Sequence, residues 1–152
     1  MRKMKMCFHN IDVTVYGTVL DDKYPKMADD LWAFLETPQK CYSHHTVSTG
    51  ADILFKPLPL ENPPANFGNQ SNPLGDEVLY LCDINPGQLF WRGYYLCGIY
   101  GKCTEPLPTG GPVLVEIDPE YLDAYIKGCE NLWHQTSLFH KLGIVSFSRK
   151  ED

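Results

Sequence analysis

The chain has 152 residues, of which 43% are apolar and 12% aromatic, which is enough for one domain with a core that needs no cross-links. Its formal charge of -6 at pH 7 is spread along the chain, which argues against nucleic acid as a partner. No apolar run is long enough to span a membrane, and no export signal follows the basic residues at the start. We therefore expect one cytoplasmic domain over residues 1–152.

The six cysteines are irregularly spaced, and the sequence holds neither a Cys-x-x-Cys pair nor a His-x3-His cluster. Structural zinc sites draw their ligands from such pairs, so the sequence predicts no metal. Because no export signal is present, we expect the cysteines to be reduced thiols.

The first predicted element is one strand from Met4 to Val19. Polar and apolar residues alternate there, and Ile11, Val13 and Val15 share one face, which is the period of two typical of a half-buried strand. We expect this strand to open the sheet.

A helix is expected next, over residues 23–36. Apolar side chains recur at helical spacing, Asp21 and Asp22 precede them as N-cap candidates, and Pro25 falls in the first turn. Pro38 ends the helix, because a proline disfavours the α conformation in the residue before it.

The middle of the chain predicts short strands and one long loop. Residues 40–58 indicate a hairpin, and residues 77–82, 88–91 and 94–101 are further strand candidates. Residues 57–75 contain five prolines, four asparagines and two glycines, a composition typical of a long loop that closes over a site.

The last part of the chain predicts a strand, a helix and a final strand. After a loop over residues 104–112, apolar residues alternate over 113–118, and Asp118 and Pro119 then begin a helix that runs to about His134. Residues 144–147 form the last strand. The order β, α, several β, α, β predicts a mainly β or α+β domain.

Four segments, taken in this order, resemble the bacterial cyclophilin-like domain family: DDLWAFL, HHTVSTG, INPGQLFW and GIYGKCTEP. The resemblance spans nearly the whole chain. It implies a closed antiparallel β-barrel of about eight strands, with a helix capping each open end. The matching residues are Trp32, His44 or His45, Ser48 with Gly50, Pro86 with Gly87, and Tyr100 with Gly101.

The same fold family includes cucumopine and mikimopine synthases, which join histidine to 2-oxoglutarate without a cofactor. This similarity implies a cofactor-independent condensation of the Pictet-Spengler type. In such a reaction an amino acid or arylethylamine and a 2-oxo acid form an imine, which a ring carbon then attacks.

Three alternatives differ from this reading. Prolyl isomerases of the cyclophilin class carry a Phe-His-Arg stretch, whereas Phe8 and His9 are followed here by Asn10, so their site cannot be drawn on this chain. A barrel that binds a small metabolite without turnover is the main rival. The third is an interaction domain that forms a homo-oligomer.

The candidate acids and bases are two neighbouring histidines and two glutamates. His44 and His45 point to opposite faces of a predicted strand, so only one faces the barrel mouth, and we favour His45 as the base. Glu77 and Glu105 are the carboxylates nearest the predicted strands, and burial would fit either for acid-base work. Solvated strand ends are the plain alternative for both glutamates.

Substrate binding is assigned to one cation and a set of rings. The guanidinium of Arg92 can hold a carboxylate through two parallel hydrogen bonds, although a surface ion pair is as good an explanation. Aromatic walls are offered by Trp91, Tyr94 and Tyr100, with His44 beside them, but aromatic residues in strands more often fill the core.

Overall fold

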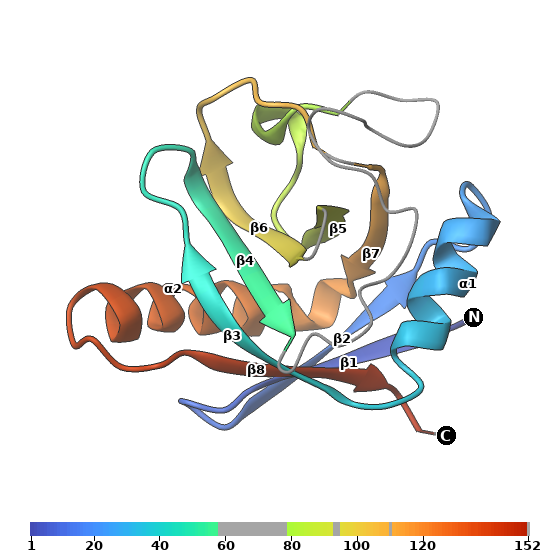
Figure 1. Cartoon of the computed structure of the whole chain (residues 1–152), viewed down its shortest axis with the longest axis horizontal. Helices are drawn as coiled ribbons and strands as arrows, with labels where there is room; N and C mark the ends of the chain where they lie inside the picture. The colour runs from blue at the N-terminus through green and yellow to red at the C-terminus, as the bar shows by residue number, and fades with distance from the viewer. Residues whose placement is uncertain (58–78, 93–94, 110, 152) are drawn as a thin grey trace.

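The computed structural model describes residues 1–57, 79–92, 95–109 and 111–151. Within these ranges eight antiparallel strands close into a barrel in the order β1-β2-β7-β5-β6-β4-β3-β8 (Figure 1). This confirms the predicted closed barrel with two α-helices. The strands are β1 (Lys3–Phe8), β2 (Val13–Val19), β3 (Gln39–His45), β4 (Gly50–Pro57), β5 (Gln88–Arg92), β6 (Tyr95–Cys103), β7 (Val113–Ile117) and β8 (Ile144–Arg149), and the helices are α1 (Pro25–Phe34) and α2 (Leu122–Ser137).

The single strand predicted from Met4 to Val19 is wrong, because the chain folds back on itself between β1 and β2. The two strands pair antiparallel, with Phe8 opposite Val13. Asp12 has a φ of 52°, a left-handed conformation that a short polar side chain tolerates. The alternation changes phase at His9 and Asn10, from buried even positions before them to buried odd positions after them, and the prediction of one strand overlooked this change.

Neither helix begins with the side-chain cap that the sequence predicted. Helix α1 has Tyr24 at its N-cap position, and Asp21 instead forms an ion pair with Arg2 at 2.7 Å. A short 3-10 turn (Pro119–Tyr121) precedes α2, and the Asp118 carboxylate accepts hydrogen bonds from Lys3 at 2.7 Å and Thr18 at 2.6 Å. Both aspartates therefore hold the barrel strands or their ends rather than cap a helix.

The remaining predicted elements are close to those observed. The hairpin over residues 40–58 is confirmed as β3 and β4, and the last strand is longer than predicted. The strand expected over residues 77–82 is wrong where it is described, since Tyr80 makes an isolated bridge to Pro108 and a 3-10 turn (Leu81–Asp83) follows. The long loop lies outside the described residues from residue 58 onward.

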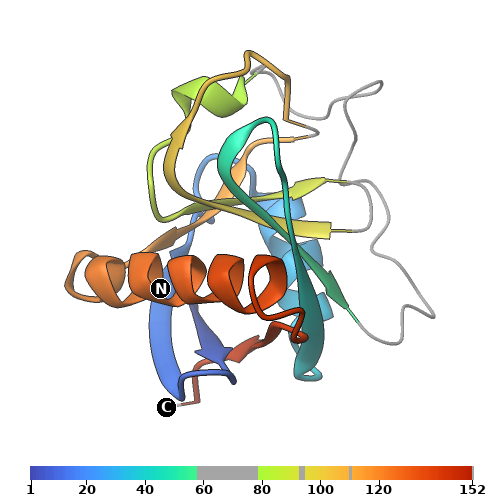
Figure 2. The ribbon, with the colours of Figure 1, turned by 90° about the vertical axis from the view of Figure 1, so that its left-hand side faces the viewer.

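The barrel interior is closed by one helix at each end. Figure 2 shows α2 lying across the front of the barrel, with α1 on its far side. Among the described residues neither helix is long and apolar enough to cross a membrane, and all six cysteines are free thiols. Ala28 and Leu31 of α1, Leu35 directly after it, and Tyr125, Cys129 and Leu132 of α2 are buried in one core with strand residues such as Met4, Phe8, Phe55 and Phe147.

Candidate functional site

The strand β3 places His45, and not His44, against the interior of the barrel. Side chains alternate along a strand, so His45 shares a face with buried Cys41 and Ser43, while His44 is exposed on the opposite face. His45 is half-buried because β3 ends there, beside α2. It therefore keeps access to solvent while contacting the packed end of the barrel.

His45 forms a hydrogen-bonded pair with Tyr100 of β6. Strand pairing brings the two together, since His45 lies opposite Ile53 of β4, Ile53 lies opposite Gly98 of β6, and Tyr100 follows two residues later on the same face. The His45 Nε2 and Tyr100 Oη atoms are 2.5 Å apart.

The tautomer of His45 follows from its second contact. The Nδ1 atom lies 2.5 Å from the carbonyl oxygen of Thr46, which can only accept, so Nδ1 carries the proton. In the neutral ring, Nε2 then accepts a hydrogen bond from the Tyr100 hydroxyl. Burial lowers the pKa of His45, which keeps the ring neutral near pH 7, and burial raises the pKa of Tyr100 to about 12.

Helix α2 adds an aromatic ring to the pair. The Trp133 ring lies 4.3 Å from the His45 ring between centroids, and the Tyr100 ring lies 5.6 Å from it at a steep angle. Three rings from β3, β6 and α2 thus meet at the α2 end of the barrel. The sequence indicated no role for Trp133, since its contact with His45 depends on how α2 closes the barrel.

A buried carboxylate lies on β4, the strand between the two strands that carry His45 and Tyr100. Asp52 of β4 is fully buried and accepts a hydrogen bond from the Thr49 hydroxyl at 3.3 Å. The Asp52 carbonyl accepts from both the backbone N–H of Thr46 at 3.2 Å and its hydroxyl at 3.0 Å. The Thr46 and Thr49 hydroxyl oxygens also lie next to each other. These bonds fix the β3–β4 turn and with it the carbonyl that sets the His45 tautomer.

The sequence did not single out Asp52, and the strand pairing explains why. The register between β4 and β6 shifts between Gly50 and Asp52, and Gly50 has a φ of 117°, a conformation that side chains rarely adopt. A glycine at the first position of a strand, as Gly50 is in β4, is a signal for such an irregularity.

The other predicted site residues lie in different places. Trp91 is fully buried and packs against Phe34 of α1 at 4.9 Å between ring centroids, and its strand partner Leu96 precedes Tyr100 by four residues. Glu105 is partly exposed in the loop after β6, and the adjacent Thr104 donates its N–H to the Thr49 carbonyl at 3.0 Å. Glu105 is therefore near the β3–β4 turn, whereas Trp91 is not with His45.

Three predicted residues cannot be placed. Glu77 and Tyr94 lie outside the described residues, as does the side chain of Arg92. In the part of the chain that the structure describes, no group of three His, Cys, Asp or Glu side chains is arranged to hold a metal ion.

Comparison with known proteins gives a fold but no family. No family model matches the sequence, and no curated protein does. Among solved structures, the structure of McbB in complex with tryptophan is similar, with a TM-score of 0.82 and 19% identity. The match covers 98% of this chain and 45% of McbB, so the chain spans less than half of that protein.

A second similar structure is the solution structure of the hypothetical protein AF2241 from Archaeoglobus fulgidus. Its TM-score is 0.54 at 12% identity, and the match covers 98% of this chain and 95% of that one. At these identities the likeness concerns the fold alone. The chain therefore adopts the closed, helix-capped barrel that McbB has, which is consistent with the cyclophilin-like fold.

Proposed function

We propose that the chain catalyses a cofactor-independent, Pictet-Spengler-type condensation of an amino acid or arylethylamine with a 2-oxo acid. The observation that carries the proposal is the His45–Tyr100 pair, a neutral imidazole and a phenol joined at 2.5 Å beside an aromatic ring. The similar fold of McbB supports it, because that protein is seen with tryptophan, which is both an amine and an aromatic ring.

The reaction needs proton transfers but no exchange of electrons. The amine adds to the keto carbon, and the resulting carbinolamine loses water to give an iminium ion. A ring carbon then attacks the iminium carbon, a carbon–carbon bond forms, and the ring carbon gives up its proton to a base. The product is the sum of both substrates minus one water.

The His45–Tyr100 pair suits the last step. As the Tyr100 oxygen takes the ring proton, its own proton moves to Nε2 of His45, so no free phenolate with a pKa of about 12 needs to form first. The Thr46 carbonyl stabilises the imidazolium that results, through the Nδ1–H bond. Trp133 and Tyr100 would hold the substrate ring.

The other roles fall to residues proposed from the sequence. Glu105, or Glu77, would protonate the departing hydroxyl of the carbinolamine, and Arg92 would hold the carboxylate of the oxo acid. Tyr94 would extend the aromatic wall. Orientation of both substrates by these groups supplies the rest of the acceleration.

The test is mass spectrometry of the purified protein with histidine, tryptophan and other arylethylamines against a panel of 2-oxo acids. A product at the summed mass minus one water, formed faster than without protein, is the expected result. Tyr100→Phe and His45→Gln should each lower the rate by about 100-fold or more, since general acid-base groups contribute at least that much.

His44→Gln is the matched control, because His44 is the exposed neighbour on the opposite face of β3. Its rate should equal that of the unchanged protein. Saturable binding of an amine or oxo acid with no product from any pair would replace the enzyme proposal with a metabolite-binding barrel.

A further inference from the structure

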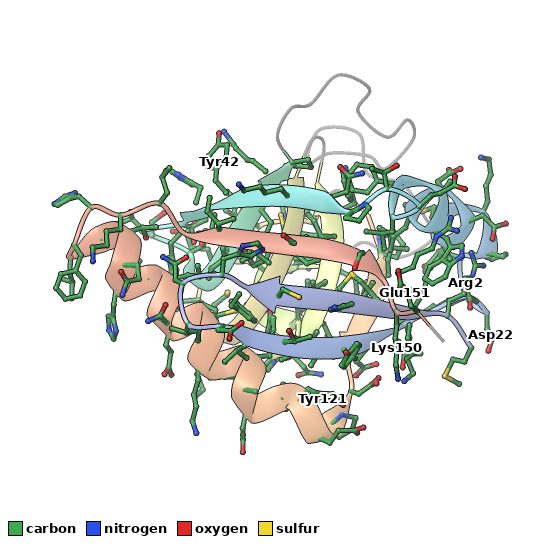
Figure 3. All side chains as sticks on the ribbon, turned by 90° about the horizontal axis from the view of Figure 1, so that it is seen from below. Arg2, Asp22, Tyr42, Tyr121, Lys150 and Glu151 are labelled. Carbon is green, nitrogen blue, oxygen red and sulfur yellow. The ribbon has the colours of Figure 1, made fainter. Side chains whose placement is uncertain are left out.

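The outer face of β8, β1 and β2 carries a groove that the proposed reaction does not use. No described helix covers this face, and Figure 3 looks directly onto it, with Lys150 and Glu151 labelled near its end. The groove has a volume of about 700 Å³, and its side wall comes from Leu35, Glu36 and Pro38 after α1. This volume falls in the range of small-molecule sites.

Strand register places one lysine on the floor of the groove. Lys5 of β1 lies between Tyr16 of β2 and Ser148 of β8, which are its cross-strand partners. The ammonium group of Lys150 lies 5.0 Å over the Tyr16 ring. Two lysines and the Ser148 hydroxyl therefore line the groove together with Tyr16.

These two lysines differ from the other cations of the same region. Lys3 is paired with Asp118 at 2.7 Å, and Arg2 is paired with Asp21 and Asp29 at 2.7 Å each. Among the described residues, no carboxylate lies within ion-pair distance of Lys5 or Lys150. Their charge is available to a ligand.

The arrangement of donors favours one kind of anion. The Arg149 guanidinium also lines the groove, and its Nε and Nη2 atoms donate to the Trp32 carbonyl at 3.0 and 2.6 Å, which occupies that edge and leaves Nη1 to donate to a ligand. Together with the two ammonium groups and the hydroxyls it presents donors from several directions, which match the many acceptor oxygens of a phosphate group.

We propose that this groove binds a small phosphorylated anion, held by Lys5 and Lys150 with the hydroxyls of Tyr16 and Ser148. The site lies on the outside of the barrel, whereas His45 faces the interior and α2. It is therefore a second site, independent of the proposed condensation. Three cations (Lys5, Arg149 and Lys150) and two carboxylates (Glu36 and Glu151) line the groove, so its lining has an excess of one positive charge on a chain whose total charge is -6.

Inorganic pyrophosphate is the probe, titrated at constant ionic strength while amide resonances are followed by NMR. Binding should be saturable, with the largest shifts at Lys5, Tyr16 and Ser148. Lys5→Glu should weaken binding about tenfold or more, because it replaces an attraction with a repulsion at short range. Lys150→Gln, at an exposed residue directly after β8, should weaken it by a smaller factor and gives a second variant if Lys5→Glu does not fold.

Lys127→Glu is the control, since Lys127 is exposed on α2 and the substitution changes the net charge by the same amount. It should bind pyrophosphate as the unchanged protein does. Shifts that never saturate, or equal weakening by Lys127→Glu and Lys5→Glu, would show a general charge effect and overturn the proposal.

Discussion

The two ends of the barrel are closed by a helix in the same way but with different chemistry. At the α1 end, Leu31 and Leu35 pack with the fully buried Trp91, whose ring meets Phe34. At the α2 end, the packing surface includes Asp52, His45 and the hydroxyls of Tyr100 and Tyr125.

This difference separates two tasks, closing an end of the barrel and holding reactive groups in place. Apolar side chains alone are enough to close an end, because burying them is favourable whatever their exact arrangement. A buried polar group needs a defined partner, and two at the α2 end have one: the Tyr125 hydroxyl donates to the Ile99 carbonyl at 3.0 Å, and Asp52 accepts from Thr49 at 3.3 Å. We therefore expect the α1 end to determine stability and the α2 end to determine function.

The largest effect on stability is expected at the α1 end. Trp91→Ala should lower the free energy of unfolding by about 3–5 kcal/mol, because it removes a fully buried ring and leaves a cavity. Urea unfolding followed by circular dichroism measures this loss. Trp133→Ala at the α2 end removes a ring that is only partly buried and should cost clearly less; equal losses would remove the distinction between the ends.

The next effect concerns the buried carboxylate at the α2 end. Thr49→Val keeps the side-chain shape but removes the hydroxyl that donates to Asp52, so we expect a loss of about 1.5–3 kcal/mol, the usual value of a hydrogen bond to a charged group. The same urea experiment applies. Thr14→Val is the control, because Thr14 is exposed on β2. Its free energy of unfolding should stay within about 0.5 kcal/mol of that of the unchanged protein. A loss at Thr49 no larger than at Thr14 would mean that the Asp52 network does not stabilise the fold.

The fold was largely predictable, because its signals are local. The period of two identified β7, short strand candidates were placed correctly at β5 and β8, and the spacing of apolar residues identified both helices. The turn between β1 and β2 was missed although His9 and Asn10 shift the phase of the alternation, because the prediction joins the polar and apolar residues on either side into one run. The capping roles of Asp21 and Asp118 were wrong because partners distant in sequence, Arg2 and Lys3, take those carboxylates.

The candidate site was predictable only where one strand decides the geometry. Alternation along β3 meant that only one of His44 and His45 could face the interior, and the structure shows that it is His45. Tyr100 was proposed as an aromatic wall, but its bond to His45 depends on the pairing of β3, β4 and β6, which no local pattern contains. Trp133 depends in addition on the docking of α2.

A smaller effect on stability distinguishes Tyr125 of α2 from Tyr121 of the 3-10 turn before it. Tyr125→Phe removes a buried hydroxyl, but the Ile99 carbonyl keeps the N–H of Gly87 as a donor at 2.8 Å, so the loss should be about 1 kcal/mol. Tyr121→Phe, at a partly exposed ring, should change the free energy of unfolding by less than about 0.5 kcal/mol. The midpoints of urea unfolding compare the two variants. A larger loss of stability at Tyr121 would contradict the claim that the buried Tyr125 hydroxyl stabilises the fold through its partner.

The smallest effect is a dependence of stability on pH that arises at His45. Burial lowers the pKa of His45 in the folded state below the ordinary value of about 6.5, so between these two values the unfolded chain binds more protons than the folded one. The stabilising contribution is therefore present above the unfolded pKa and is lost as the pH falls through the folded pKa.

His45→Gln should flatten this acid-side loss, because glutamine binds no proton. The measurement is the free energy of unfolding at a series of pH values from about 7.5 down to about 5, the range over which an ordinary histidine titrates. His44→Gln removes an exposed imidazole from the same strand and should leave the slope unchanged. If His45→Gln loses as much stability in acid as the unchanged protein does, the α2 end does not hold its histidine neutral. The proton transfer proposed for the His45–Tyr100 pair would then lack the neutral base on which it depends.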